Sequence, residues 1–369
     1  MRLQSVFLFL ALCLLTGCAA LRSQRDSRGD SVADQNSRPV SQSSPVHKGQ
    51  IEQVRATDGE LIHVSNVVAS SSPAASFQRS LLYHPTKSDH LQAKDCRVAQ
   101  SVLDVQVTAH DKLVLNGWLA LAPKMGSDPS PWPYCFSIDP NERLPAVTPQ
   151  EALTLLDEGR PLVIVFSGNG GHRAMRGTLM DVLRTLGADV LMFDYRGYGD
   201  NPGDPAEAHF VQDARAIWNF AIADLKIPAK RIVLYGESLG GGVATRLASD
   251  LCSAGIEPRG LIVQSSFNSI VDVGRFHFPI LPVSTLSVDR FESERHITRV
   301  TCPYLHLHGE QDEVIPLPLG KKLFQAAPEK SSSQIAKQFV PLPHSHHNDV
   351  YDQDRERAMN AIREFMARL

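Results

Sequence analysis

The sequence predicts a doubly wound α/β domain, in which a mostly parallel sheet carries helices on both faces, from about residue 75 to residue 369. Short, almost continuous apolar runs alternate with longer amphipathic segments from residue 162 onward. Strands that are apolar on both faces are typical of parallel sheets covered by helices. The length of 369 residues and the hydrophobic content of 43% are enough for one large domain of this kind.

The expected elements follow one another along the chain. Residues 102–107 alternate apolar and polar side chains, and residues 113–121 are their expected antiparallel partner, with Asp111 and Lys112 at the turn. The Pro-rich segment 122–161 is expected to be an inserted loop with one helical piece at 149–159. The later expected strands are 162–166, 189–194, 231–235, 260–264, 304–308 and 336–342, and the expected helices are 174–186, 205–223, 239–254, 317–327 and 351–369.

The first 18 residues have the pattern of an export signal. Arg2 precedes the apolar run 6–15, which is too short to span a bilayer comfortably. The segment ends Leu-Thr-Gly-Cys at residues 15–18, which resembles the lipobox of bacterial lipoproteins. The resemblance implies that Cys18 is acylated, and Ala19 implies sorting to the outer membrane, facing the periplasm. An ordinary secretory signal, cut after a small residue, is the alternative.

Residues 19–74 are expected to be a disordered tether, because most of this stretch is polar and has no apolar period. Residues 51–68 are more mixed and could hold a strand or belong to the tether. If the compartment is oxidising, Cys96 and Cys135 are the expected disulfide pair. Cys252 and Cys302 fall in an expected helix and at an expected strand edge, where small buried hydrophobic side chains are expected.

The composition excludes some classes of function. A net charge of -3, without basic runs interleaved with aromatic residues, excludes a nucleic-acid-binding protein. No Cys or His pair has zinc spacing, so neither a metal nor another cofactor is expected.

Ser238 is the candidate nucleophile. It is the centre of Gly-Glu-Ser-Leu-Gly, residues 236–240, between an expected strand and an expected helix rich in small residues. In that context Gly-x-Ser-x-Gly forms a strained turn that lifts the serine oxygen clear of the sheet, and the flanking glycines avoid clashes. A chance occurrence of the pattern is the alternative, but the flanking elements and the partners downstream argue against it.

A serine hydroxyl needs a base and a carboxylate that orients the base. Asp312 lies in His-Gly-Glu-Gln-Asp-Glu-Val-Ile-Pro, residues 308–316, on the loop after an expected strand. Glu310 and Glu313 are the alternative acids, more typical of solvated loop charges.

The base must come from Pro-His-Ser-His-His-Asn-Asp, residues 343–349, where His344, His346 and His347 compete. A metal-binding histidine cluster is the alternative, although no carboxylate or thiol at helical spacing completes it. Attack by a serine develops a negative charge on the acyl oxygen, and two backbone N–H groups are needed to stabilise this oxyanion. The backbone N–H groups of Leu239 and Asn169 are the expected donors. Asn169 lies in the glycine-rich segment 167–171, which lacks the Lys-Ser/Thr of a phosphate loop.

Together these motifs resemble the α/β-hydrolase superfamily, in its serine-aminopeptidase-like, α/β-hydrolase-domain branch. Asp-Tyr-Arg-Gly-Tyr-Gly at residues 194–199 is similar to a motif of that branch, although members of the branch usually have a Ser soon after it and residues 200–203 contain none. In the glycine-rich segment 167–171, Ser167 stands where relatives often have a His. The resemblance covers about residues 162–369. The resemblance implies an α/β-hydrolase fold and a catalytic triad of Ser238, Asp312 and His347. His347 is selected among the three histidines because relatives read His-Asn-Asp at the catalytic histidine. The resemblance also implies that Arg196 has a structural role and braces the loops around the serine turn.

The resemblance implies a serine hydrolase that forms an acyl-enzyme. The segment between the strand at 260–264 and the strand at 304–308 has room for only a small cap, which favours a small-molecule or lipid acyl ester or thioester as substrate. One alternative is a serine peptidase or aminopeptidase, which would need acidic cap residues such as Asp272 and Glu292. The other is a non-catalytic, lipid-anchored binding protein of the cell envelope.

Overall fold

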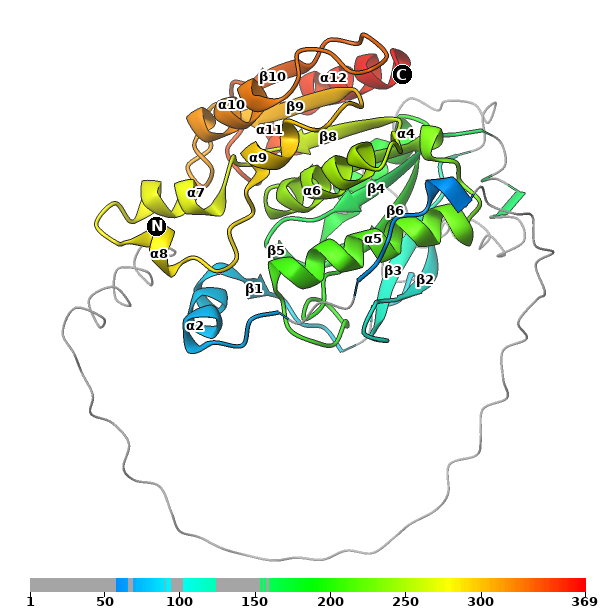
Figure 1. Ribbon diagram of the computed structural model, residues 1–369. Coiled ribbons are helices and arrows are strands. Elements are labelled where there is room, and N and C mark those ends of the chain that lie inside the picture. The colour runs from blue at the N-terminus through cyan, green and yellow to red at the C-terminus, as the bar shows by residue number, and fades with distance from the viewer. Residues whose placement is uncertain are drawn as a thin grey trace, which may run out of the picture. The chain divides into compact units, whose positions relative to one another are not determined.

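The computed structural model describes residues 58–65, 69–89, 91–93, 102–123, 153, 154, 156 and 159–369 (Figure 1). The expected signal segment with Cys18, the expected pair Cys96 and Cys135, and most of the Pro-rich insert lie outside the described residues. Residues 54–369 form one compact unit. Residues 153, 154 and 156, within the helical piece expected at 149–159, are helical. Among the residues described, no helix has both the length and the apolar character needed to cross a membrane.

An eight-stranded sheet forms the centre of this unit, in the order β10-β9-β8-β7-β4-β6-β3-β2 (Figure 1). β3 is antiparallel to both β2 and β6, and the other neighbouring strands are parallel. The mostly parallel sheet predicted from the sequence is therefore confirmed. The strands are β2 (Val102–Thr108), β3 (Val114–Ala120), β4 (Leu162–Phe166), β6 (Asp189–Phe193), β7 (Ile232–Glu237), β8 (Gly260–Gln264), β9 (Tyr304–Gly309) and β10 (Gln338–Leu342).

The sheet separates two hydrophobic cores, as β4 illustrates. Leu162, Ile164 and Phe166 join one core with side chains of α5 and α6, which lie in front of the sheet in Figure 1. Val163 and Val165 join the other core with side chains of α4 and α12. Alternate side chains of a strand point to opposite faces of the sheet, and all five side chains of β4 are buried. Both faces of the sheet are therefore covered by helices, as predicted.

The helices that cover the two faces of the sheet have bounds close to those predicted. They are α4 (Gly177–Thr185), α5 (Glu207–Ala223), α6 (Leu239–Ser253), α10 (Leu317–Ala326), α11 (Val350–Gln353) and α12 (Arg355–Ala367). Short 3-10 turns precede α4 and β7, as η4 (Arg173–Arg176) and η5 (Ala229–Arg231). The single helix expected at 351–369 is two helices, because the chain leaves helical geometry at Asp354, where φ is -122° and ψ is 33°.

Part of the stretch assigned to the tether belongs to the fold. Residues 58–65, which begin with the 3-10 turn η1 (Asp58–Glu60), lie against α5: Trp218 Nε1 donates to Glu60 O and Ile62 N donates to Asn219 Oδ1, each at 2.9 Å. α2 (Pro73–Leu82) also begins before residue 75. After it, β1 (His84–Pro85) pairs with β5 (Gly170–Gly171). Composition alone does not reveal such contacts, because their partners lie more than 80 residues away in sequence.

The predicted small cap is a set of three short helices between β8 and β9. They are α7 (Ile270–His277), α8 (Val283–Leu286) and α9 (Ser293–Ile297), and α7 and α8 project beyond the sheet in Figure 1. Asp289, between α8 and α9, accepts hydrogen bonds from Arg79 Nε at 2.8 Å and from the Tyr83 hydroxyl at 2.7 Å. The cap is therefore held to the α2 segment by a buried carboxylate.

Candidate active site

Ser238 occupies a strained turn between β7 and α6. Its φ of 52° and ψ of -115° are rare for a residue with a side chain, and such a conformation costs about 1–3 kcal/mol. The turn is held by two hydrogen bonds, because Ser238 N donates to Gln264 O at 2.9 Å and Ser266 Oγ donates to Ser238 O at 2.7 Å. These contacts with the residues at and after the end of β8 fix the serine at the carboxyl edge of the sheet.

The two glycines that flank this turn are needed because the backbone is close-packed there. A Cβ on Gly236 would lie 2.4 Å from Gly240 O, and a Cβ on Gly240 would lie 2.0 Å from Phe166 O. Neither neighbour is a side chain that could rotate away. The spacing Gly-x-Ser-x-Gly is therefore a steric requirement of this fold.

The structure brings Ser238, His347 and Asp312 together in one hydrogen-bonded row. His347 Nε2 lies 2.9 Å from Ser238 Oγ, and His347 Nδ1 lies 2.8 Å from Asp312 Oδ2. An ionised carboxylate can only accept a hydrogen bond, so Nδ1 carries the imidazole proton and Nε2 accepts from the serine hydroxyl. All three residues are more than nine-tenths buried, with exposures of 8%, 7% and 6%. This arrangement can transfer the serine proton to the imidazole.

Asp312 is held by the loop that follows β9. Its Oδ1 accepts from Val314 N at 3.0 Å and Ile315 N at 2.7 Å, which leaves Oδ2 directed at His347. The alternative acid Glu313 is exposed at its carboxylate and pairs with His346 at 3.0 Å. Asp312 is the acid of this loop that contacts His347.

The other two histidines of the 343–349 loop face different carboxylates. His344 Nδ1 lies 3.1 Å from Asp354 Oδ1, while His346 Nδ1 lies 3.0 Å from Glu313 Oε2. Asp354 also accepts from the Ser345 hydroxyl at 2.6 Å, so it fastens the loop that carries His347 to the start of α12. Across the described part of the chain, no three His, Cys, Asp or Glu side chains are grouped so that they could hold a metal ion.

Of the two expected oxyanion donors, Leu239 directly follows the serine. Leu239 is the first residue of α6, and the first amides of a helix have no partner within the helix. The side chain of Asn169 is engaged elsewhere: its Nδ2 donates to Leu82 O and its Oδ1 accepts from the Tyr198 hydroxyl at 2.8 Å. Asn169 therefore ties its loop to the α2 segment, and donation by its backbone N–H remains a prediction.

Arg196 braces a different place from the one expected. Its guanidinium bonds Asp213 of α5 at 2.8 and 2.6 Å and Asp111 of the β2–β3 turn at 2.8 Å, not the loops around the serine turn. Tyrosines of the same motif approach the site instead, since the Tyr195 hydroxyl donates to Ser167 O at 2.9 Å. Burial raises the pKa of Asp213, although contact with Arg196 opposes that rise.

An ion pair beside the serine was not foreseen from the sequence. Arg176 Nε lies 3.1 Å from Glu237 Oε2, and Arg176 Nη2 donates to Gly170 O at 2.7 Å. Arg176 thus links the glycine-rich loop to the residue directly before Ser238. The charged residue inside Gly-Glu-Ser-Leu-Gly is the only signal that could have indicated a cationic partner.

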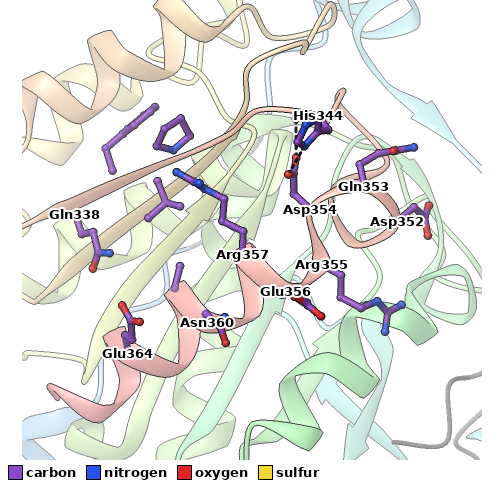
Figure 2. Close-up of a pocket in the computed structure, with 14 residues that line it drawn as sticks. Gln338, His344, Asp352, Gln353, Asp354, Arg355, Glu356, Arg357, Asn360 and Glu364 are labelled. Atoms are coloured by element: carbon purple, nitrogen blue, oxygen red, sulfur yellow. Dashed lines mark hydrogen bonds and ion pairs between the residues drawn. The ribbon is translucent and has the colours of Figure 1, made fainter.

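A separate groove of about 860 Å³ runs between the edge strand β10 and α12 (Figure 2). His344 and Asp354 line one end of it, and Gln338, Asn360 and Glu364 line the other. None of Ser238, His347 and Asp312 lines this groove, so it is distinct from the candidate active site.

The cysteines predicted to be small buried side chains are free thiols. Cys302 is buried and Cys252 is half-buried. Their mutual hydrogen bond lowers the pKa of Cys252 to about 6, although burial opposes that shift.

Comparisons with known proteins identify the family of the chain. Residues 157–276 match the family described as serine aminopeptidase, S33. An uncharacterized protein of Mycobacterium tuberculosis is 33% identical over 289 residues, which are 78% of this chain and 87% of that protein. The lysophosphatidylserine lipase ABHD12 of Danio rerio is 36% identical over 201 residues, 50% of this chain and 52% of the lipase.

The fold also has counterparts among solved structures. The Pyrococcus furiosus esterase Pf2001 superposes with a TM-score of 0.54 at 17% identity, covering 78% of this chain and 97% of the esterase. At that identity the likeness concerns the fold alone. With the serine turn, the order of strands and the family match in agreement, the chain belongs to the α/β-hydrolase superfamily.

Proposed function

We propose that this protein is a serine hydrolase that cleaves acyl esters or thioesters through Ser238, His347 and Asp312. The observation that carries the proposal is the buried row of hydrogen bonds from Asp312 Oδ2 through His347 to Ser238 Oγ, at 2.8 and 2.9 Å. Such a row supplies a base within reach of a nucleophile and a carboxylate that orients the base.

The geometry supports a two-step reaction. Ser238 Oγ bonds to the acyl carbon while its proton passes to His347 Nε2, and the Leu239 amide faces the developing oxyanion. The tetrahedral adduct collapses, and the leaving alcohol or thiol takes the proton from His347. Water then attacks the acyl-enzyme with His347 again as base, which releases the acid and restores the serine hydroxyl. Asp312 stays ionised throughout and stabilises the imidazolium.

An acyl or lipid substrate is supported by the apolar surface of the cap. Phe276 and Ile280 are 58% and 92% exposed, although both are large apolar side chains. His277 Nε2 contacts Val314 O at 2.8 Å, so the end of α7 adjoins the loop that carries the acid. On the side of the glycine-rich loop, Met175 is 61% exposed. The similarity to the lysophosphatidylserine lipase supports the same class of substrate.

An aminopeptidase activity has less support. Such an enzyme needs a cap carboxylate that is available for the substrate's ammonium group. Asp272 is bonded to Lys322 at 2.9 Å and to Arg275 at 3.2 Å, and Glu292 is bonded to Arg290 at 3.3 Å. A substrate ammonium would have to displace a cation already in place.

A fluorophosphonate probe together with p-nitrophenyl butyrate tests the proposal. The wild-type protein should be labelled at Ser238 and should hydrolyse the ester. Ser238→Ala should abolish labelling and lower kcat by roughly 10⁴ or more, with an unchanged thermal transition. A wild-type protein that is neither labelled nor active would indicate a non-catalytic binding protein instead.

We also propose that the protein is held in the bacterial cell envelope by acylation of Cys18, facing the periplasm from the outer membrane. The support is the sequence Leu-Thr-Gly-Cys at residues 15–18 and the polar stretch that follows it. A single acyl chain binds membranes only marginally, so stable anchoring requires more than one chain on this cysteine.

A further inference from the structure

Three polar side chains form a buried row beneath the loop that carries Asp312. Tyr304, His306 and His308 alternate along β9, so they point to the same face of the sheet. The Tyr304 hydroxyl lies 2.7 Å from His306 Nδ1, and His306 Nε2 lies 3.1 Å from His308 Nδ1. His308 Nε2 lies 2.8 Å from Ile315 O. Their exposures are 3%, 0% and 0%, so all three side chains are shielded from bulk solvent.

Elementary hydrogen-bond chemistry fixes the direction of every bond in this row. A backbone carbonyl only accepts, so His308 Nε2 must carry a proton and donate it to Ile315 O. In a neutral imidazole the other nitrogen is an acceptor, so His308 Nδ1 accepts from His306 Nε2–H. By the same argument His306 Nδ1 accepts from the Tyr304 hydroxyl. The row therefore runs in one direction, from Tyr304 to Ile315.

The surroundings keep both imidazoles neutral. Burial lowers the pKa of His308, and His347 lowers it further, while Ile315 O and Asp312 oppose the shift. Burial and then His308 lower the pKa of His306 far below its usual value. From α10, Gly320 faces His308, since a Cβ there would lie 2.3 Å from His308 Nδ1, and from β10 the Phe339 ring is 5.1 Å from that of His306. A charged group on this side is Lys337, whose ammonium lies 4.7 Å from the centre of the Phe324 ring, and that ring packs against Tyr304.

The end of the row is the turn that holds the acid. Ile315, whose carbonyl accepts from His308, donates its own N–H to Asp312 Oδ1 at 2.7 Å. His308 Nε2 is also 3.7 Å from Asp312 Oδ2, the oxygen that faces His347. The tautomer of His308 therefore affects both oxygens of the carboxylate, one through the turn and the other through space.

We propose that Tyr304, His306 and His308 are positioning residues, whose directed hydrogen bonds hold His308 as the neutral Nε2–H tautomer and so fix Asp312 against His347. This inference rests on the proposed function, because it assigns the row a task in the same reaction. None of the hydrogen bonds of these three side chains reaches Ser238.

Protonation of His308 would reverse the direction of the hydrogen bonds in the row. If His308 were protonated, its Nδ1–H would donate to His306, and His306 would donate to the Tyr304 oxygen. The hydroxyl proton of Tyr304 would then lose its acceptor, and a positive charge would lie 3.7 Å from Asp312 Oδ2, in competition with His347. Tyr304 thus biases the row toward the neutral state.

Tyr304→Phe is the sharpest test, since it removes one hydroxyl without changing a group near the serine. We expect kcat to fall about tenfold, with KM unchanged. Because the variant no longer disfavours protonated His308, the acid limb of kcat/KM should move to higher pH by about half a unit to one unit. His308→Leu should lower kcat about 100-fold, whereas His308→Gln, whose amide still offers an N–H donor group and a carbonyl acceptor, should recover most of that loss.

Phe339→Leu is the matched control, because it weakens packing on His306 and removes no hydrogen bond of the row. It should lower thermal stability and leave the pH profile unchanged. Equal pH profiles for Tyr304→Phe and wild type, or an equal shift in Phe339→Leu, would overturn the inference.

A measurement without turnover separates this inference from the proposed function. The low-field proton resonance of His347 Nδ1–H reports the bond to Asp312, and it should shift in Tyr304→Phe and stay in place in Phe339→Leu. An inactive wild-type protein would overturn the proposed function alone, and the resonance would still decide whether the row positions Asp312. An unshifted resonance in Tyr304→Phe would overturn the positioning role even in an active enzyme.

Discussion

Adding one methyl group at Gly240 should separate activity from folding. The Cβ of Gly240→Ala would lie 2.0 Å from Phe166 O, 2.4 Å from Phe166 C and 2.6 Å from Ser167 O. Side-chain carbons do not approach backbone atoms closer than 3.0 Å, so β4 and α6 must separate by about 1 Å. Misplacing a reacting group by that distance costs about 100-fold in rate. We therefore expect kcat/KM to fall about 100-fold.

The stability of this variant should change much less than its activity. Overpacking costs about 1–3 kcal/mol, but alanine in a helix recovers about 0.5–1 kcal/mol relative to glycine. Gly242→Ala in the same helix is the control, since the nearest atom to its Cβ is Phe291 Cδ1 at 3.0 Å, which belongs to a side chain and not to the backbone. The assay combines kcat/KM for p-nitrophenyl butyrate, the rate of fluorophosphonate labelling and thermal unfolding. A folded Gly240→Ala that keeps more than about a third of wild-type activity would refute the steric argument.

Three further outcomes are expected. His347→Ala should lower kcat by roughly 10⁴, as is expected for Ser238→Ala. His344→Ala and His346→Ala should keep most activity, since their side chains are 72% and 50% exposed. Equal losses in all three variants, or rescue by zinc, would indicate a metal site. Asp354→Asn should lower the free energy of unfolding by about 1–3 kcal/mol at pH 7. Burial would raise the pKa of the Asp354 carboxyl, but hydrogen bonds from the Ser345 hydroxyl and the His344 imidazole outweigh burial and lower it. The stabilisation of the folded state by this carboxylate is therefore present above about pH 4 and is lost as the pH falls through the lowered pKa. Denaturant curves at pH 7 and pH 3 test this, and a constant difference would contradict it. Cys18→Ser should move the protein from the membrane fraction to a soluble or uncleaved form, and wild-type protein free in the periplasm would contradict acylation.

Local patterns allowed much of the fold to be predicted. β4 and β8 have the predicted bounds, because each is a short apolar run buried on both faces and bounded by polar or turn residues. The serine turn could be predicted for the same reason, since strand, turn and helix are contiguous and the glycines are a local steric requirement. The candidate acid and base followed from their order along the chain and from a family resemblance.

The parts that were missed depend on contacts between distant segments. α2 and the cap helices are short, and they are stabilised by Asp289, whose partners Arg79 and Tyr83 lie more than 200 residues earlier. Arg196 was expected to brace the loops around the serine turn because the family resemblance of residues 194–199 implied that role. Its partners Asp111 and Asp213 were invisible, because no spacing in the sequence connects three separate elements.

The contrast between what could and could not be predicted has a physical origin. Ser238 lies on a tight turn at the end of a strand, and that turn requires glycines at fixed spacing. A group that positions it needs only one hydrogen bond of the right direction, which many residues on many elements can supply. Ser238 is held through Gln264, His347 through the loop that Asp354 fastens, and Asp312 through Ile315 and His308. Gln264 and His308 bond backbone groups of the turn or loop concerned, and Asp354 accepts from the backbone N–H of His344 at 2.9 Å as well as from side chains. For that reason the proposed catalytic residues could be predicted from the sequence, whereas the groups that hold them emerge only when the strands are placed side by side.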